Sequence, residues 1–278
     1  MSNKNGPAWA SFTRLFRETA PHHHRYDVFR DFVTMAAFAL HNAVRKDERL
    51  EAEYMTIIGR YPREDANRFP KLLAELTTLL DPEPWDALGQ LYMELGIASE
   101  HVGQFFTPPE LSELMARLTY GEELDRLKKP FVTVQEPACG AGGMILAFAK
   151  LMVSKGMNPA YRMWAHCQDV DRTAALMCYL QLALWNVPAT VVVGNTLTME
   201  TREVFHTPAY YLGMWEYRLK RHFEEKEEEL GNLIELESTP ATTETSPEVL
   251  TPSEPPHETL NRLVPSPKGA QIQFDFGF

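Results

Sequence analysis

Short apolar runs alternate with segments of helical spacing between residues 131 and 193, and this alternation limits the folds that are open to the chain. The runs occupy residues 131–135, 163–168 and 191–193. The intervening residues 143–153 and 172–184 carry apolar side chains at the spacing of a helix. Strands that alternate with helices of this length form βαβ units around a parallel sheet. We therefore predict an α/β fold for this part of the chain.

The first hundred residues show a different pattern, in which one helical segment follows another. Residues 27–44 carry Phe29, Phe32, Val33 and Ala36 at helical spacing, and prolines at positions 62, 70, 82 and 84 separate the later segments. This pattern predicts a helical N-terminal domain over residues 1–100, followed by an α/β domain over residues 101–230.

The charge of the chain is unevenly distributed. The 278 residues include 27 basic and 38 acidic side chains, a net charge of −11. Between Glu224 and Glu258, eleven acidic residues oppose the single basic residue Lys226, so the rest of the chain is nearly neutral. Residues 231–270 are rich in Pro, Thr, Ser and Glu, a composition typical of disorder. We predict one long helix over residues 209–230 and a disordered acidic tail over residues 231–278.

Three cysteines without CxxC spacing indicate neither a disulfide framework nor a four-ligand zinc site. His22, His23 and His24 are interpreted as a polar loop, because adjacent histidines do not converge on one tetrahedral metal. No secretion signal and no apolar run of about 18 residues is present. The expectation is a cytoplasmic protein with no membrane association and no metal.

Three motifs carry the chemical signal, and two of them lie at strand ends. The sequence Glu136-Pro137-Ala138-Cys139-Gly140-Ala141-Gly142-Gly143 lies between the first strand and its helix. Its small residues let the backbone approach a ligand, and the helix after it offers unpaired N–H groups. Asp169 and Asp171 follow the second strand, where an acidic side chain can bind ribose hydroxyls. Upstream stands Gly103-Gln104-Phe105-Phe106-Thr107-Pro108-Pro109.

In this order the motifs resemble the adenine-N6 DNA methyltransferases, most closely the modification (M) subunit of type I restriction systems. That family has GQ-aromatic-F-TP, then a DPACGSGG-like turn, an acid after the second strand and a GDTL-like turn after the third. The chain has corresponding sequences, ending with Gly194-Asn195-Thr196-Leu197, and the resemblance covers roughly residues 25–200. It implies a partial Rossmann-like methyltransferase sheet that binds S-adenosylmethionine (SAM).

The resemblance implies a role for each matching residue. Gln104 to Pro109 would line the methionine end of SAM, Glu136 and the glycine turn would lie beneath it, and Asp169 would bind the ribose. Asn195 stands where the family has an aspartate that contacts adenine, and an amide can also donate or accept there. The expected cofactor-binding residues are Gln104, Phe105, Phe106, Thr107, Pro108, Pro109, Glu136, Ala138, Cys139, Gly140, Ala141, Gly142, Gly143, Asp169 and Asn195.

One family motif is missing from the sequence. Members end their fourth strand in Asn-Pro-Pro-Tyr/Phe, which holds the flipped adenine, and no such sequence follows residue 197. Asn158-Pro159-Ala160-Tyr161 precedes the second strand, and Thr207-Pro208-Ala209-Tyr210 lacks a carboxamide, so the catalytic residues are unknown. We expect a truncated sheet whose first strand has an open edge. The helix from about Ala209, another copy of the chain or a partner such as a specificity subunit would cover it.

The last residues carry a separate motif. Gln271-Ile272-Gln273-Phe274-Asp275-Phe276 resembles the hexapeptide by which bacterial proteins dock on the replication sliding clamp. The alternative is that these residues fold back as a strand, for example on the open sheet edge.

Three functions are compatible with these motifs. The first is a SAM-binding DNA adenine methyltransferase-family protein that reaches DNA through a partner subunit or has lost catalysis. The second is a non-enzymatic scaffold, such as an anti-restriction or replication-interacting protein of a mobile element. The third is a methyltransferase that acts on another substrate, because the same fold hosts many acceptors.

Overall fold

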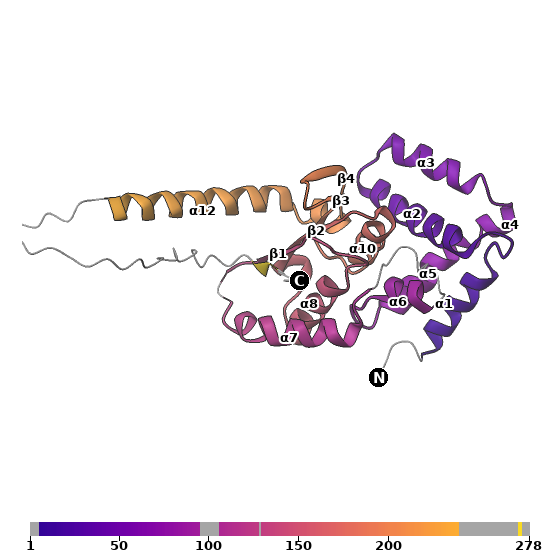
Figure 1. Ribbon diagram of the computed structural model, residues 1–278, viewed down its shortest axis with the longest axis horizontal. Helices are drawn as coiled ribbons and strands as arrows, with labels where there is room; N and C mark the ends of the chain where they lie inside the picture. The colour runs from indigo at the N-terminus through magenta and orange to yellow at the C-terminus, as the bar shows by residue number, and fades with distance from the viewer. Residues whose placement is uncertain (1–5, 95–105, 128, 239–271, 274–278) are drawn as a thin grey trace, which may run out of the picture. The chain divides into compact units, whose positions relative to one another are not determined.

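The computed structural model describes residues 6–94, 106–127, 129–238 and 272–273 (Figure 1). The chain divides into two compact units, one of Met1–Trp215 with Gln271–Phe278 and the other of Glu216–Ala270. The helices are α1 (Pro7–Glu18), α2 (Arg25–Val44), α3 (Glu48–Ile58), α4 (Arg63–Ala66), α5 (Phe69–Leu80), α6 (Ala87–Glu94), α7 (Pro109–Asp125), α8 (Gly143–Ser154), α9 (Pro159–Arg162), α10 (Arg172–Leu184), α11 (Pro208–Leu212) and α12 (Trp215–Ser238). The strands are β1 (Val132–Glu136), β2 (Met163–Asp169), β3 (Ala189–Asn195), β4 (Glu200–His206) and β5 (Ile272–Gln273).

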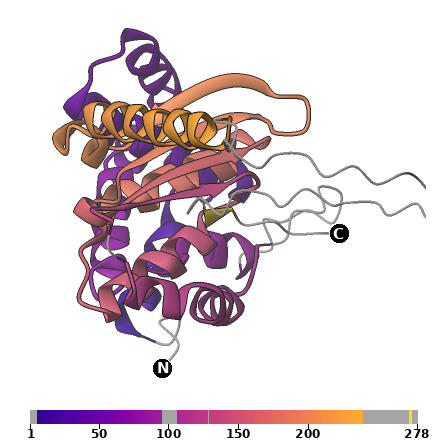
Figure 2. The same cartoon turned by 90° about the vertical axis from the view of Figure 1, so that its left-hand side faces the viewer.

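The sheet has the order β4-β3-β2-β1-β5, and its central strands are parallel as the sequence predicts (Figure 2). In β2, Met163, Ala165 and Cys167 are fully buried, whereas the residues between them are half-buried. The strand order runs in one direction from β1 to β3, so right-handed crossovers place α8 and α10 on the same face of the sheet. This confirms the α/β fold and its parallel core.

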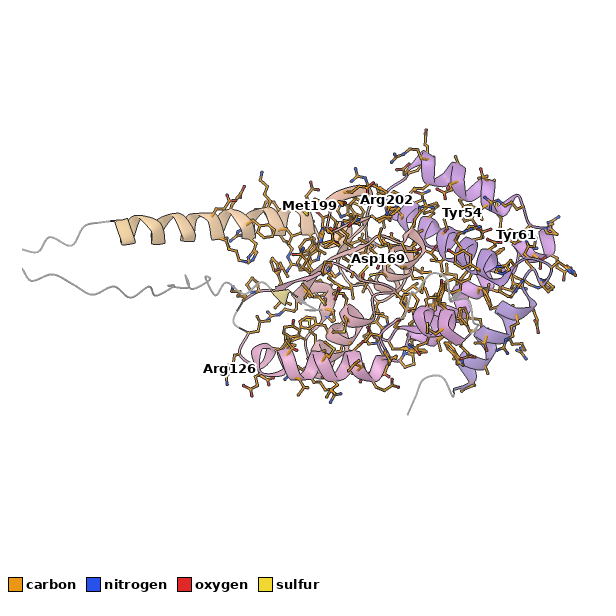
Figure 3. All side chains as sticks on the ribbon, viewed as in Figure 1. Tyr54, Tyr61, Arg126, Asp169, Met199 and Arg202 are labelled. Atoms are coloured by element: carbon orange, nitrogen blue, oxygen red, sulfur yellow. The ribbon has the colours of Figure 1, made fainter. Side chains whose placement is uncertain are left out.

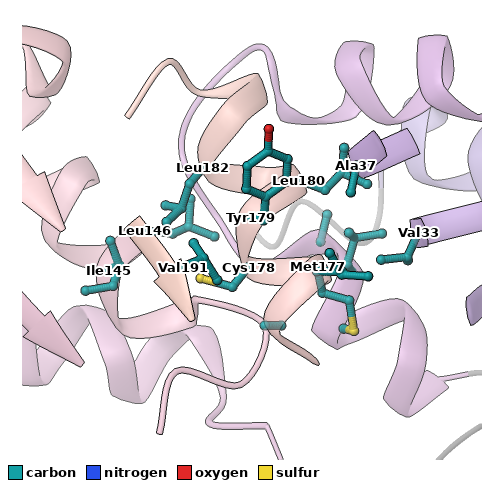
Figure 4. Packing of buried hydrophobic residues seen from close by; sticks show 14 of the residues in the cluster. Val33, Ala37, Ile145, Leu146, Met177, Cys178, Tyr179, Leu180, Leu182 and Val191 are labelled. Atoms are coloured by element: carbon teal, nitrogen blue, oxygen red, sulfur yellow. The ribbon is translucent and has the colours of Figure 1, made fainter. Parts of the chain in front are cut away.

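The helical segment and the sheet share one hydrophobic core. Helix α10 is buried nearly all round, because the sheet lies against one side of it and α2 against the other. Figure 4 shows Val33 and Ala37 of α2 beside Leu180, while Leu146 of α8 lies with Leu182 near Val191 of β3. The predicted helices of the first hundred residues therefore pack directly on the predicted α/β segment.

Strand β4 is a further strand beyond the three that the sequence predicts. It pairs antiparallel with β3, and Val191 lies opposite Phe205. Most of its side chains are exposed, because β4 is the outer strand of the sheet and buries only Phe205. An exposed edge strand lacks the apolar alternation that marks a buried strand.

Two boundaries near the end of the chain also differ from the expectation. The helix predicted over residues 209–230 is broken at Gly213 and Met214, and Met214 has a positive φ of 50°. Its second part, α12, continues to Ser238, so residues 231–238 are helical and not part of a disordered tail. Residues 239–271 and 274–278 lie outside the described residues.

The free side of β1 is the edge that the sequence predicts to be open. Val134 of β1 pairs with Ile272 of β5, and Gln135 pairs with Gln273, in parallel register. This pairing corresponds to the alternative in which the last residues fold back on the sheet.

We expect removal of residues 271–278 to increase self-association of the chain, because it exposes the backbone donors and acceptors of β1. Light scattering coupled to gel filtration would measure this. Proline at both Ile272 and Gln273 should have the same effect, because proline cannot donate a backbone hydrogen bond. Alanine at both positions should leave the association state unchanged. A truncated chain with the same mass in solution as the full chain would contradict the expectation.

Candidate functional site

The predicted site residues converge where the parallel strands end. Glu136 ends β1, Asp169 ends β2 and Asn195 ends β3. The carboxyl ends of parallel strands meet at one edge of the sheet, which is where open α/β sheets bind ligands. Asp169 lies near the middle of the structure in Figure 3, with Met199 and Arg202 of the β3–β4 hairpin close by in that view.

Backbone hydrogen bonds fasten the glycine turn, residues 137–142, to the end of β2. The N–H of Cys139 donates to the carbonyl of Gln168 at 2.8 Å, and the N–H of Gly140 donates to Oδ2 of Asp169 at 2.8 Å. On the β3 side, the hydroxyl of Thr196 donates to the carbonyl of Pro137 at 2.7 Å. Three motifs that are far apart in the sequence therefore form one connected cradle.

The glycines of the turn have steric reasons to be glycine. Gly142 has φ +90°, and a Cβ there would lie 2.9 Å from Sγ of Cys178 in α10. Gly140 has φ +52°, and a Cβ there would lie 3.1 Å from the ring of Phe106. Phe106 in turn packs edge-on against Tyr92 of α6, with ring centroids 5.3 Å apart. The turn can approach its neighbours this closely only because it lacks side chains.

We expect Gly142→Ala to destabilise the folded chain by about 3 kcal/mol, because alanine is strained at this φ and crowds Cys178. Urea unfolding would measure the change. Gly121→Ala is the matched control: Gly121 lies within helix α7, and an added Cβ there meets nothing within 4 Å. It should stabilise the chain by about 0.5–1 kcal/mol. Equal effects of the two substitutions would contradict this account.

Glu136 is a buried carboxyl group at the bottom of the cradle. Only 2% of it is exposed, and its Oε1 accepts a hydrogen bond from the N–H of Ala138 at 3.2 Å. Its Oε2 is buried without a hydrogen-bond partner among the described residues. Burial raises the pKa of Glu136 to about 7, and the nearby Asp169 adds to the effect. A buried acceptor without a partner indicates a missing donor.

Asp169 organises the loop between β2 and α10. Its Oδ1 accepts a hydrogen bond from the N–H of Asp171 at 2.8 Å, in addition to the bond from Gly140. Burial raises the pKa of Asp169, although these two backbone donors act in the opposite direction. Asp171 caps α10 by accepting from the N–H of Ala174 at 2.7 Å. The two aspartates therefore have separate roles, and only Asp169 contacts the glycine turn.

Asn195 shapes the turn that follows β3. Its Oδ1 accepts hydrogen bonds from the N–H groups of Leu197 at 2.9 Å and Thr198 at 3.3 Å. Because this oxygen is engaged, the NH₂ group is the part of the amide that can meet a ligand. Leu197 and Val170, on the neighbouring loops, are 94% and 60% exposed.

The remaining predicted residues are placed less completely. Phe106 packs on the glycine turn, Thr107 and Pro108 are exposed, and Pro109 begins α7. Gln104 and Phe105 lie outside the described residues. Of the described residues of this motif, Phe106 is the one whose side chain lies against the glycine turn.

Both sequences that resemble the missing catalytic motif have structural roles. Oδ1 of Asn158 accepts from the N–H of Ala160 and caps α9, ahead of β2. The hydroxyl of Thr207 is fully buried, donates to the carbonyl of Val187 at 2.7 Å and accepts from the N–H of Ala189 at 2.9 Å. Thr207 is therefore not available to a substrate, and Asn158 lies in a turn before β2 rather than at the carboxyl end of a strand.

Sequence reasoning missed a residue that connects three elements beside the site. Arg172 begins α10 and forms two hydrogen bonds each with Glu53 of α3 (2.8 and 3.0 Å) and Glu203 of β4 (2.7 and 3.0 Å). The only local signal is its position directly after Asp171. Glu53 is 119 residues away in sequence, so no motif spacing links the two.

Comparisons with known proteins agree with this geometry. Residues 87–223 match the family model described as N-6 DNA Methylase. The methylase subunit of the type I restriction enzyme MpnII from Mycoplasma pneumoniae is 29% identical over 124 residues, which cover 42% of this chain and 21% of that protein. The chain thus spans about a fifth of the length of this curated relative.

Two solved structures are also similar. One, from Listeria monocytogenes, is named as a class I S-adenosylmethionine-dependent methyltransferase; it has a TM-score of 0.38 and 16% identity, over 66% of this chain and 51% of that one. The other, a type I restriction-modification methyltransferase subunit from Streptococcus thermophilus, has a TM-score of 0.35 and 19% identity, over 64% and 36%. The match to the family model is the main finding of these comparisons: residues 87–223 of this chain are similar to N-6 DNA methylases.

Proposed function

We propose that the chain binds SAM in the cradle at the end of the sheet and works with partner subunits on DNA, as a restriction-modification methyltransferase-type protein. The observation that carries this proposal is the connection between Gly140 and Asp169, together with the buried Oε2 of Glu136, which has no hydrogen-bond partner among the described residues. When bound, SAM supplies the methyl group for transfer to an adenine amino nitrogen.

The donors and acceptors of the cradle fit SAM. Glu136 Oε2 offers a buried acceptor to the amino group of its methionine part, and Asp169 offers a carboxylate to its ribose hydroxyls. The N-terminus of α8 presents unpaired N–H groups to a carboxylate. A Cβ at Gly140 or Gly142 would fill space or clash at the turn. Phe106 would close the same end of the site.

The adenine end of the cofactor fits the β2 and β3 loops. Val170 and Leu197 are exposed apolar side chains that a flat base could cover. The NH₂ group of Asn195 would donate to a ring nitrogen of adenine. An aspartate at this position could only accept, so Asn195 changes the direction of the hydrogen bond and not the location of the base.

We propose no methyl transfer by the chain alone. The sequence contains no Asn-Pro-Pro, and the two similar sequences have structural roles. Base flipping requires a pocket for the extruded adenine, so a partner would have to supply it. The partner would also provide target recognition. The three free cysteines are buried, in keeping with the cytoplasmic location that we propose. No helix in the described part of the chain is long and apolar enough to cross a membrane.

Two measurements test the proposal in sequence. Titration calorimetry of the full chain with SAM should show binding. The absence of a binding heat at millimolar SAM would refute the proposal. Transfer of tritiated methyl groups to DNA should be absent with the chain alone and appear when the partner subunits are added.

A non-enzymatic scaffold is the second candidate, because the catalytic motif is missing while the parallel strands and the glycine turn are present. The two candidates differ at the cradle: a scaffold need not bind SAM. Binding of SAM without methyl transfer, even with partners present, would favour a scaffold that retains its cofactor.

A further inference from the structure

A buried hydrogen-bond circuit links the helical N-terminal segment to the glycine turn. Nε2 of Gln181 in α10 donates to the carbonyl of Ala141 in the turn at 2.8 Å and to Oδ1 of Asp86 at 3.0 Å. Oε1 of the same side chain accepts from the N–H of Leu88 at 3.0 Å. Gln181 is completely buried and Asp86 is 3% exposed. A single amide group therefore connects α10, the start of α6 and the turn.

The circuit also satisfies the first turn of α6. Oδ1 of Asp86 accepts from the N–H of Gly89 at 2.7 Å, so Asp86 caps the helix while it holds Gln181. A Cβ at Gly89 would lie 2.1 Å from Oδ2 of Asp86. The same oxygen lies 3.5 Å from the place where a Cβ of Gly143 would stand, at the beginning of α8. The carboxylate of Asp86 thus leaves no room for a side chain at Gly89, whereas a Cβ at Gly143 would be in ordinary contact with it.

We propose that Gln181, held by Asp86, is a positioning residue that sets the orientation of the Gly140–Ala141–Gly142 backbone for SAM. Within Gly140–Ala141–Gly142, two groups are held by residues outside the turn: Asp169 holds the N–H of Gly140, and Gln181 holds the carbonyl of Ala141. Without the bond from Gln181, the Ala141 carbonyl loses its partner, and the adjoining glycines restrict the rotation of its peptide group little. The inference rests on SAM as the cofactor, and it makes the N-terminal helices a structural part of the cofactor site.

The chemistry of Gln181 explains why another residue cannot replace it. The NH₂ group donates twice, to Ala141 and Asp86, and the oxygen accepts once from Leu88. Methionine has a similar length and none of these bonds, so it leaves the Ala141 carbonyl and the Leu88 N–H unpaired. Glutamate keeps the shape, but its carboxylate faces a second carboxylate and a carbonyl oxygen. Only when protonated can it donate to either.

The experiment compares four variants of the full chain. Gln181→Met and Gln181→Glu change the circuit. Tyr179→Phe removes a buried hydroxyl on the same helix that has no hydrogen-bond partner in the described part of the chain. Leu180→Ala destabilises the core beside Ala37 of α2 without altering a bond to the turn (Figure 4). SAM affinity is measured by calorimetry at pH 6 and pH 8, together with the thermal unfolding temperature.

Gln181→Met should bind SAM at least tenfold more weakly than the unchanged chain. Leu180→Ala should lower the unfolding temperature with affinity within twofold, and Tyr179→Phe should change neither. Gln181→Glu should match Gln181→Met at pH 8 and recover at pH 6, each affinity taken relative to the unchanged chain at that pH. Affinity within twofold in Gln181→Met would overturn the inference, as would an equal loss in Leu180→Ala. If Gln181→Met fails to fold, Gln181→Glu at the two pH values decides.

Hydrogen exchange of the free protein separates this inference from the proposed function. In Gln181→Met, backbone amides of residues 139–142 should exchange faster than in the unchanged chain, while those of β3 keep their rates. Unchanged exchange at the turn overturns the inference. If the unchanged chain does not bind SAM, the proposed function fails and the exchange result alone decides whether Gln181 positions the turn.

Discussion

Replacing Asp169 by alanine is expected to weaken SAM binding by at least about 100-fold. The carboxylate would accept hydrogen bonds from two ribose hydroxyls, and bonds to a charged acceptor contribute about 1.5–3 kcal/mol each. The same side chain holds the N–H of Gly140, so its loss also releases the turn. Calorimetry measures the affinity, and circular dichroism confirms that the variant is folded.

Asp171→Ala provides the matched control. It removes the same chemical group two residues away, where the carboxylate caps α10 through the N–H of Ala174. Losing a helix cap costs about 1 kcal/mol of stability, and we expect SAM affinity to fall by less than tenfold. If both substitutions reduce the affinity equally, Asp169 has no special part in cofactor binding.

Glu136→Gln is expected to stabilise the chain at pH 8 and to weaken SAM binding at the same pH. Burial raises the pKa of Glu136 from 4.5 to about 7. Between these pH values the folded chain keeps a proton that the unfolded chain has lost, so the stability falls as the pH rises. Above pH 7 the free energy of unfolding is lower by about 3 kcal/mol than it is below pH 4.5, as far as Glu136 contributes to it. Glutamine cannot ionise and avoids this cost.

Thermal unfolding at pH 4.5 and pH 8 tests the stability part. The two proteins should unfold at similar temperatures at pH 4.5, and the glutamine variant at a higher temperature at pH 8. At pH 8 the unchanged chain should bind SAM more tightly than the glutamine variant, because the ionised carboxylate is the acceptor for the methionine ammonium. The ratio of the affinity of the unchanged chain to that of the variant should drop about tenfold from pH 8 to pH 6. A ratio independent of pH would remove Glu136 from the cofactor site.

Much of the site could be predicted because its signals are local in sequence. The glycine turn follows a buried strand directly, and Asp169 ends the next one, so strand order alone brings them to one edge. Gln181 and Arg172 could not be predicted in this way. Their partners Asp86, Ala141 and Glu53 lie 40 to 119 residues away, and only packing of α10 against distant elements brings them together. The local signs are a glutamine between Leu180 and Leu182 and, for Arg172, its position directly after Asp171.

The outer parts of the fold were harder to predict for a different reason. Strand β4 exposes most of its side chains and is held by backbone pairing with β3, which leaves little trace in the side-chain pattern. The break at Gly213 and Met214 interrupts a sequence that reads as one helix. The extension of α12 to Ser238 follows from good helix-forming residues, although its composition resembles that of a solvated tail.

The pairing of β5 with β1 has a consequence for the order of events during synthesis. Strands β1 to β4 are complete once residue 206 is made, but the partner of Val134 is residue 272. At about 5–20 residues per second, roughly 3 to 13 seconds of translation separate the two. Through that interval the β1 edge of every nascent chain is open to another strand. A strand of another chain can therefore pair with this edge during synthesis, before Ile272 and Gln273 are made.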